Sequence, residues 1–299
     1  MVLVAAQKGG VGKTSLTAGL GALMASTRRR VLLIDADQQA NLSRRNFGLH
    51  DSDGGRGLYA SVVLGQPLLP VREVRPGLDI VAGGAALALV PTAAAADSAQ
   101  LDLVGHLRAA LSALTASTAY SLVLIDVGPG DVALLDALLG TVRFVLAPTR
   151  EDDADLDGVE KLIARMLRAR KDRNPDLELL GVVRFGVDLR ATVRNSATEQ
   201  ALRQLLHGSG VEPFTACIRH APAAARDMRA HSLTPQELVA RSQDAASQRI
   251  DRLRSHAPRL PADQQVYARS TQASSLASDY LHVLKELLQR IGTAQKAAA

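Results

Sequence analysis

Short apolar runs bounded by turn residues alternate with longer segments of helical periodicity along most of the chain. The runs VLVAA (2–6) and VLLID (31–35), for example, flank a segment in which apolar residues recur every three or four positions. This alternation is typical of a mainly parallel, twisted β-sheet flanked by helices, so we predict the α/β class. The expected strands are 2–6, 31–35, 78–83, 121–126, 143–148, 177–185 and 212–218. The expected helices are 14–26, 98–115, 131–139, 154–171 and 192–208, with a helical C-terminal part from Thr234 that breaks at Pro258 and Pro261.

The chain has no internal repeat and no segment of linker composition, and its 299 residues are 47% hydrophobic. That length and hydrophobic content suffice for one large core, so we predict a single domain over residues 1–299. Residues 241–269, rich in Arg, Ser, Gln and Asp, are expected to form a solvent-facing insertion. Residues 270–292 are expected to form a C-terminal helix.

Cysteine content and hydropathy restrict the cellular context. Cys217 is the only cysteine, which excludes an internal disulfide and an all-cysteine metal or iron–sulfur site within one chain and suits a reducing cytoplasm. The opening residues MVLVAAQKGG lack the basic segment and long apolar stretch of a signal peptide. No apolar run reaches the length of a membrane span, so we expect a cytoplasmic protein without stable membrane insertion.

The sequence KGGVGKTS (8–15) follows a predicted strand and opens a predicted helix. This is the context of a phosphate-binding loop, in which glycines let backbone N–H groups point at phosphates beside a helix N-terminus. Lys13 is expected to reach the β- and γ-phosphates, the Thr14 hydroxyl to ligate Mg²⁺, and Ser15 to contact the α-phosphate. The other expected loop residues are Gly9, Gly10, Val11 and Gly12. The predicted cofactors are therefore ATP and Mg²⁺.

Two departures from the usual loop pattern point to a particular family. Gln7 stands where G-x-x-x-x-G-K-[ST] has glycine, and an additional lysine, Lys8, precedes the glycines. The form K-G-G-x-G-K-T resembles the deviant Walker A family of P-loop ATPases, which includes ParA/Soj partition proteins, MinD, the nitrogenase iron protein and the arsenical-pump ATPase. The resemblance implies a homodimer in which Lys8 crosses the interface to the partner's nucleotide. A second cation beside one triphosphate is useful mainly when it bridges two subunits across developing charge.

Two further segments resemble the switch regions of this family. VLLIDADQQANLS (31–43) is similar to switch I, which implies that Asp37 orients the attacking water and that Asp35 supports the Mg²⁺ shell or the P-loop lysine. A carboxylate near its reference pKa of about 3.9 is a weak general base at neutral pH, so we expect slow hydrolysis. SLVLIDVGPG (121–130) has a Walker B shape, in which Asp126 is expected to hold Mg²⁺ through water. Partition proteins usually read D-T-P-P-S from that aspartate, whereas this chain reads D-V-G-P-G.

Other segments separate the members of the family. RFVLAPTREDDADLDGVEKL (143–162) matches the partition-protein spacing, and this resemblance places Pro148 at the nucleotide site. The lone Cys217 excludes a nitrogenase iron protein, and the single P-loop separates the chain from arsenical-pump ATPases. MinD ends in an amphipathic membrane helix. The comparable apolar stripe of this chain has no Phe or Trp and is expected to pack in the core; it consists of Tyr280, Leu281, Leu284, Leu287, Leu288 and Ile291.

Basic residues suggest a partner. Lys and Arg number 35 against 30 Asp and Glu, and the net charge of +5 permits attraction to DNA or to an anionic membrane, although it also describes an ordinary solvated surface. FGVDLRATVRNSATEQALRQLL (185–206) resembles the family stretch that ends in D-x-R-T before a helix, which implies non-specific DNA binding through Arg190. The same face is extended by Arg194 and Arg203, and a second basic cluster contains Arg219 and Arg226.

Three hypotheses remain open. The first is a ParA-like, nucleoid-associated ATPase that drives plasmid or chromosome partitioning: its ATP-bound homodimer binds DNA, and slow hydrolysis, stimulated by a ParB-type centromere-binding protein, resets it. The second is a MinD-like ATPase that positions a protein cargo or acts at a membrane. The third is a metabolic P-loop ligase of the dethiobiotin synthetase kind, which has no need of Lys8 or of ATP-dependent dimerisation.

Overall fold

The computed structural model describes residues 1–96, 101–254 and 272–297, and its centre is an eight-stranded sheet with the order β3-β4-β2-β5-β1-β6-β7-β8. Neighbouring strands are parallel except for β3 and β4, which are antiparallel. Parallel strands require crossover connections, usually helices, which explains the alternating pattern of the sequence. The predicted fold class is confirmed. The strands are β1 (Val2–Val4), β2 (Val31–Ala36), β3 (Val71–Arg75), β4 (Leu78–Val81), β5 (Leu122–Val127), β6 (Phe144–Thr149), β7 (Glu178–Val187) and β8 (Ile218–Arg219).

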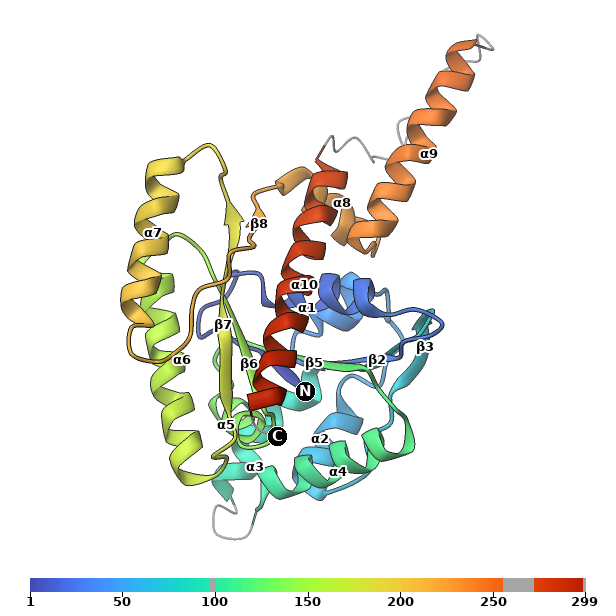
Figure 1. The fold of residues 1–299 in the computed structure, drawn as a ribbon. Helices are drawn as coiled ribbons and strands as arrows, with labels where there is room; N and C mark the ends of the chain where they lie inside the picture. The colour runs from blue at the N-terminus through green and yellow to red at the C-terminus, as the bar shows by residue number, and fades with distance from the viewer. Residues whose placement is uncertain (97–100, 255–271, 298–299) are drawn as a thin grey trace.

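Helices cover both faces of the sheet (Figure 1). Successive residues of the buried strands alternate between two cores: Leu3 packs with residues of α2, α4, α5 and α6, whereas Val2 and Val4 pack with residues of α1, α9 and α10. A strand buried on both faces requires such a continuous apolar run. The helices are α1 (Lys13–Met24), α2 (Arg56–Leu64), α3 (Val90–Ala96), α4 (Leu103–Ser117), α5 (Val132–Leu139), α6 (Asp153–Asp172), α7 (Thr192–Leu205), α8 (Pro222–Ala230), α9 (Pro235–Arg254) and α10 (Ala273–Ala297), with a π-helix η1 (Asn41–Asn46) and a 3₁₀-helix η2 (Ala85–Leu89).

The C-terminal helix α10 packs against α1, the helix that follows the phosphate-binding loop (Figure 1). Tyr280 is buried against Gly19, where an added Cβ would lie 2.5 Å from the tyrosine ring. Leu284 and Leu287 are also buried, and Leu288 and Ile291 pack at the margin of the same core. The prediction that this stripe belongs to the core is confirmed except for Leu281, which is exposed. Within the described ranges, no helix is both long and apolar enough to cross a membrane.

The predicted strand 212–218 is wrong over most of its length, because β8 comprises only Ile218 and Arg219. Pro213 has no N–H to contribute to a ladder. The N–H groups of Thr215 and Ala216 instead donate to the carboxylate of Glu286, at 3.1 and 2.9 Å. Residues 212–216 thus keep one hydrogen bond to β7, from the Phe214 N–H to the Val182 carbonyl at 2.8 Å, while a side chain of α10 takes the next two N–H groups.

Other differences concern element ends and short elements. The pattern does not predict β3, α2 or α8. The predicted helix 98–115 is observed as α4 from Leu103, where the Asp102 carboxylate caps it by accepting the Gly105 N–H at 2.8 Å. Positions 98–100, the predicted break at Pro258 and Pro261, and residues 255–269 of the expected insertion lie outside the described residues, whereas 241–254 continue α9.

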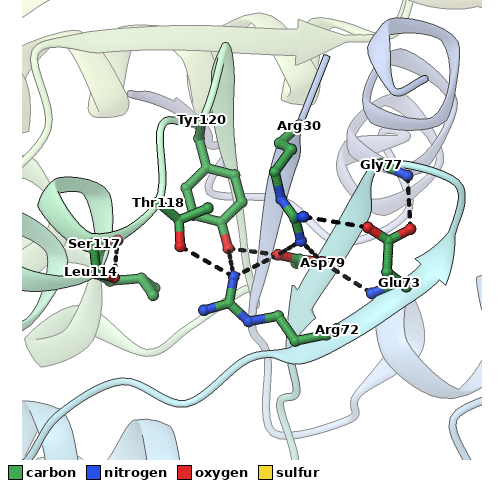
Figure 2. A network of polar contacts seen from close by, with 9 residues as sticks. All are labelled: Arg30, Arg72, Glu73, Gly77, Asp79, Leu114, Ser117, Thr118 and Tyr120. Carbon is green, nitrogen blue, oxygen red and sulfur yellow. Dashed lines mark hydrogen bonds and ion pairs between the residues drawn. The ribbon is translucent and has the colours of Figure 1, made fainter. Parts of the chain in front are cut away.

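A buried carboxylate at the amino ends of the strands holds the edge hairpin of β3 and β4 (Figure 2). Asp79 accepts hydrogen bonds from Arg30 at 2.9 Å, Arg72 at 2.8 Å, the Tyr120 hydroxyl at 2.6 Å and the Glu73 N–H at 2.9 Å. Burial by itself raises the pKa of Asp79, but these hydrogen bonds outweigh it and bring the pKa to about 2. The network fixes the irregular middle of β3, where the register with β4 shifts and Glu73 adopts a positive φ of 51°.

Candidate functional site

The predicted nucleotide residues meet at the carboxyl ends of three neighbouring strands. The loop 8–15 follows β1, Asp35 and Asp37 end β2 or follow it directly, and Asp126 lies near the end of β5. A cavity of about 610 Å³ opens here, and Gly9, Gly10, Gly12, Lys13, Thr14, Ser15 and Asp37 line it. Ligands of open parallel sheets bind at this edge, so the cavity is the candidate nucleotide site.

The loop itself has the conformation that phosphate binding requires. Gly10 and Gly12 have positive φ angles of 79° and 99°. A Cβ on Gly12 would lie 2.4 Å from the ring of Phe185, so the backbone there is packed too closely for any side chain. The buried Lys13 ammonium donates to the Lys8 carbonyl at 3.0 Å. Burial lowers the pKa of Lys13, while Asp126 and Asp37 act in the opposite direction.

Asp126 fits a metal ligand. Both of its carboxylate oxygens are buried without a hydrogen-bond partner in the described part of the chain. Burial raises its pKa well above the ordinary value, as does nearby Asp35, whereas Thr14 and Lys13 lower it. A buried carboxylate of this kind needs a cation, and the Thr14 hydroxyl is the natural second ligand for Mg²⁺. Groups of three or more His, Cys, Asp or Glu that could hold a metal by themselves are absent from the described ranges.

The Asp35 carboxylate accepts hydrogen bonds from the segment that follows β2. It accepts the Ser43 N–H at 2.8 Å, the Ser43 hydroxyl at 2.7 Å and the Asp37 N–H at 3.3 Å. Burial raises the pKa of Asp35 to about 6, against the lowering effect of those hydrogen bonds. The geometry therefore favours a role in holding the switch segment in place.

Asp37 is the one of these three aspartates that lines the cavity. It is buried, and its Oδ1 accepts the Gln39 N–H at 2.9 Å. The segment turns sharply after it, with Ala40 at a positive φ of 50° and its N–H donating to the Asp37 carbonyl at 3.0 Å. Asp37 is thus placed to orient a group inside the cavity.

Lys8 is held by acidic residues of its own chain. Its ammonium lies 2.8 Å from Asp155 Oδ1 and 3.3 Å from Asp152 Oδ2, at the start of α6. The hydrogen bond to Asp155, followed by that to Asp152, raises the pKa of Lys8 in spite of partial desolvation. The side chain remains 43% exposed, so it is accessible from outside the protomer.

Two predicted nucleotide contacts lie outside the cavity lining. Val11 is buried in the core, and Pro148 lies inside β6, in register with Val183 of β7. Phe185 and Arg150 line the cavity and are not among the predicted site residues. Both lie at the carboxyl ends of predicted strands, and this shared edge is the sequence signal that would have identified them.

The predicted DNA-binding arginines differ in how they are paired. Arg219 makes a two-pronged ion pair with Asp279 at 2.6 and 2.7 Å, Arg194 pairs with Glu151 at 2.7 Å and Arg203 with Glu199 at 2.7 Å. Arg190 and Arg226 are exposed and have no ion pair with any residue that the structure describes. Exposed arginines without a carboxylate partner are the better candidates for phosphate contacts.

Comparisons with known proteins extend these observations. A family model described as the CobQ/CobB/MinD/ParA nucleotide binding domain matches residues 2–227. The chromosome partitioning protein ParA of Caulobacter vibrioides is 33% identical over 221 residues, which are 73% of this chain and 79% of that protein. Cobyrinic acid a,c-diamide synthase from Mycobacterium smegmatis, solved with a bound ATP analog and magnesium, is 25% identical with a TM-score of 0.61, over 73% of this chain and 86% of that one. The structure of pNOB8 ParA bound to nonspecific DNA is 17% identical with a TM-score of 0.61 over 98% of each chain, a likeness of fold.

Proposed function

We propose that this chain, which belongs to the CobQ/CobB/MinD/ParA nucleotide-binding domain family, is a ParA-like partition ATPase. The resemblance to ParA/Soj partition proteins is confirmed by the relatives, and the chain is a P-loop ATPase whose cofactors are ATP and Mg²⁺. In the proposed cycle, ATP closes a homodimer that binds DNA non-specifically and moves a plasmid or chromosome. Hydrolysis then resets the protein.

One observation carries this proposal. The phosphate loop 8–15 lines the cavity and begins with the accessible Lys8, and the buried carboxylate oxygens of Asp126 have no hydrogen-bond partner among the described residues. Loop N–H groups and Lys13 would hold the β- and γ-phosphates, and Thr14 and Asp126 would hold the metal. Mg²⁺ would supply neutralisation of phosphate charge. Asp37 would orient the attacking water, and Asp35 would hold the segment that carries Asp37.

Lys8 distinguishes a partition ATPase from a monomeric ligase that shares the fold. For Lys8 to reach a partner's nucleotide, it has to exchange Asp155 and Asp152 for phosphate oxygens, which are stronger acceptors. We expect Lys8→Ala to bind ATP as a monomer and to lose the ATP-dependent dimer, with kcat reduced roughly 100-fold or more. Sedimentation with ADP and with a non-hydrolysable ATP analogue measures the first effect, and phosphate release measures the second.

The matched control for this experiment is Lys161→Ala, which removes an exposed lysine from the middle of α6. It should dimerise and hydrolyse ATP like the wild type. A wild-type protein that sediments as a monomer with every nucleotide would contradict the dimer. A Lys8→Ala protein that dimerises normally would contradict the role of the lysine.

DNA binding is proposed for the exposed arginines. Arg190 lies in the loop before α7, and Arg226 lies on α8 together with Arg229. Arg45 of η1, Arg226 and Arg229 line the cavity. Because α8 packs on η1 directly after the Asp37 segment, this surface adjoins the part of the site that senses nucleotide. A surface of this kind would contact the phosphates of DNA and would therefore bind DNA of any sequence.

We expect Arg190→Ala to weaken ATP-dependent binding of random-sequence DNA at low salt. If Arg190 contacts one phosphate, the slope of log K against log salt concentration should fall by about 1. Arg168→Ala, an equal charge change in the second half of α6, serves as the control. Unchanged affinity and slope for Arg190→Ala would place the DNA surface elsewhere. Fluorescence anisotropy across a salt series provides the measurement.

The partner and the location follow from the same proposal. A ParB-type centromere-binding protein would stimulate the slow hydrolysis, and non-specific DNA binding would place the ATP-bound protein on the nucleoid. The MinD-like alternative depended on a C-terminal amphipathic helix for the membrane. The apolar stripe of α10 is buried against α1 and the sheet, so it supports the partition reading instead.

A further inference from the structure

The Asp35–Asp37 segment lies between two glycines that come after the neighbouring strands. In the sheet, β2 runs between β4 and β5. Gly128 follows β5 directly, and Gly83 follows β4 after Ala82. A Cβ on Gly83 would lie 2.4 Å from the Asp35 carbonyl oxygen and 2.7 Å from that of Asp37. The backbone on the β4 side is therefore fixed at a distance that only glycine allows.

On the β5 side, the neighbouring glycine lies against the Asp37 side chain. A Cβ on Gly128 would lie 2.7 Å from Asp37 Oδ1 and 3.0 Å from its Cγ. The Gly128 N–H donates to the Ala36 carbonyl at 3.3 Å, which fixes the two segments relative to each other. Asp37 Oδ1 also accepts the Gln39 N–H at 2.9 Å. A shift of the carboxylate away from position 128 would therefore disturb this hydrogen bond.

The restriction at Gly128 is one of space and not of backbone conformation. Gly128 is not one of the glycines with a positive φ among the described residues, so alanine can adopt its backbone angles. The two closest atoms that alanine would meet belong to the Asp37 carboxyl group; the third, the Asp37 Cα at 3.4 Å, is an ordinary van der Waals contact. A substitution there should therefore shift this carboxylate while leaving the fold intact.

We propose that Gly128 is a positioning residue for ATP hydrolysis, whose missing side chain sets the place of the Asp37 carboxylate in the cavity. This inference rests on the proposed function, in which Asp37 orients the attacking water. A displacement of about 1 Å at a group that orients a reactant costs up to about 100-fold in rate.

The test is a double-mutant cycle between positions 128 and 37, read in single-turnover ATP hydrolysis. We expect Gly128→Ala to lower the rate constant about 10- to 100-fold and to leave the dissociation constants of ATP and ADP within about twofold of the wild type. In an Asp37→Ala background, where the contacted atoms are gone, Gly128→Ala should change the rate less than about twofold. Gly292→Ala, in a helix where a Cβ meets nothing within 4 Å, is the matched control and should be neutral.

The outcomes separate this inference from the proposed function. Asp37→Ala with undiminished hydrolysis would contradict the role of Asp37 itself. If Asp37→Ala is slow but Gly128→Ala reduces the rate equally in both backgrounds, Gly128 acts through something other than Asp37 and the inference is wrong. Wild-type hydrolysis by Gly128→Ala would also overturn it. Should Gly128→Ala fail to fold, the double variant must regain a cooperative thermal transition, since the colliding carboxylate is absent; failure of both would refute the proposal.

Discussion

Substitution of Lys13 by alanine is expected to lower kcat for ATP hydrolysis by at least about 10²–10³-fold. Lys13 is the buried cation of the phosphate loop and lies in the field of Asp126 and Asp37. Without it, the charge that develops on the phosphates would face buried carboxylates with no ammonium group to offset them. Phosphate release under saturating ATP measures the effect, and equilibrium binding of a fluorescent ATP analogue separates loss of binding from loss of turnover.

Lys13 also neutralises the carboxylates, so folding must be checked alongside activity. Lys13→Gln, which keeps much of the length of the side chain, is the second variant, and thermal unfolding by circular dichroism is the check. Lys161→Ala again provides an exposed lysine as control. Turnover within threefold of the wild type in a folded Lys13 variant would mean that the triphosphate does not bind in this loop.

The second large effect is expected at the opposite end of the sheet, where Asp79→Ala should lower the free energy of unfolding by about 1–3 kcal/mol. Removal of the carboxylate leaves Arg30, Arg72 and the Tyr120 hydroxyl without their common acceptor in the network of Figure 2. Urea denaturation followed by circular dichroism measures the change, with the exposed Asp176→Ala as control. A loss below about 1 kcal/mol would show that the network does not hold the hairpin.

The same carboxylate makes the stability depend on pH. Its pKa is about 2 in the folded protein, below the ordinary value of 3.8, so the folded state binds fewer protons than the unfolded state between these values. The contribution of Asp79 is therefore complete above about pH 4 and is lost as the pH falls towards 2. In Asp79→Asn this part of the acid destabilisation should be absent.

Local patterns in the sequence were sufficient where one short segment determines the structure. The buried strands before the phosphate loop and before Asp35 and Asp126 are continuous apolar runs, and the loop has its glycines and Lys13 in fixed spacing. These features predicted both the sheet and the edge at which the nucleotide residues meet.

The predictions that failed concern segments whose structure depends on distant residues. Residues 212–216 read as a strand, but Glu286, 70 residues further along, takes the Ala216 N–H. The edge strand VREVR has few apolar residues, and it is held by Asp79 and by Arg75, which pairs with Glu237 at 2.6 Å. No spacing rule relates such residues, because the fold alone brings them together.

The site shows the same division. Lys13 was predicted from the spacing of the phosphate loop, and Lys8 and Asp37 from the resemblance to the family, whereas their neighbours could not be predicted. That Asp155 holds Lys8, that Phe185 covers Gly12 and that Gly128 touches Asp37 are consequences of strand order. Distances between such residues cannot be predicted from one sequence without the fold.

The contribution of α10 to the lining of the nucleotide cavity has a consequence for the synthesis of the protein. Leu276 and Tyr280 line that cavity, and Asp279 fixes Arg219 beside it. The phosphate loop precedes α10 in the chain. A nascent chain therefore carries an incomplete pocket until residues 273–297 have been synthesised and have packed against α1.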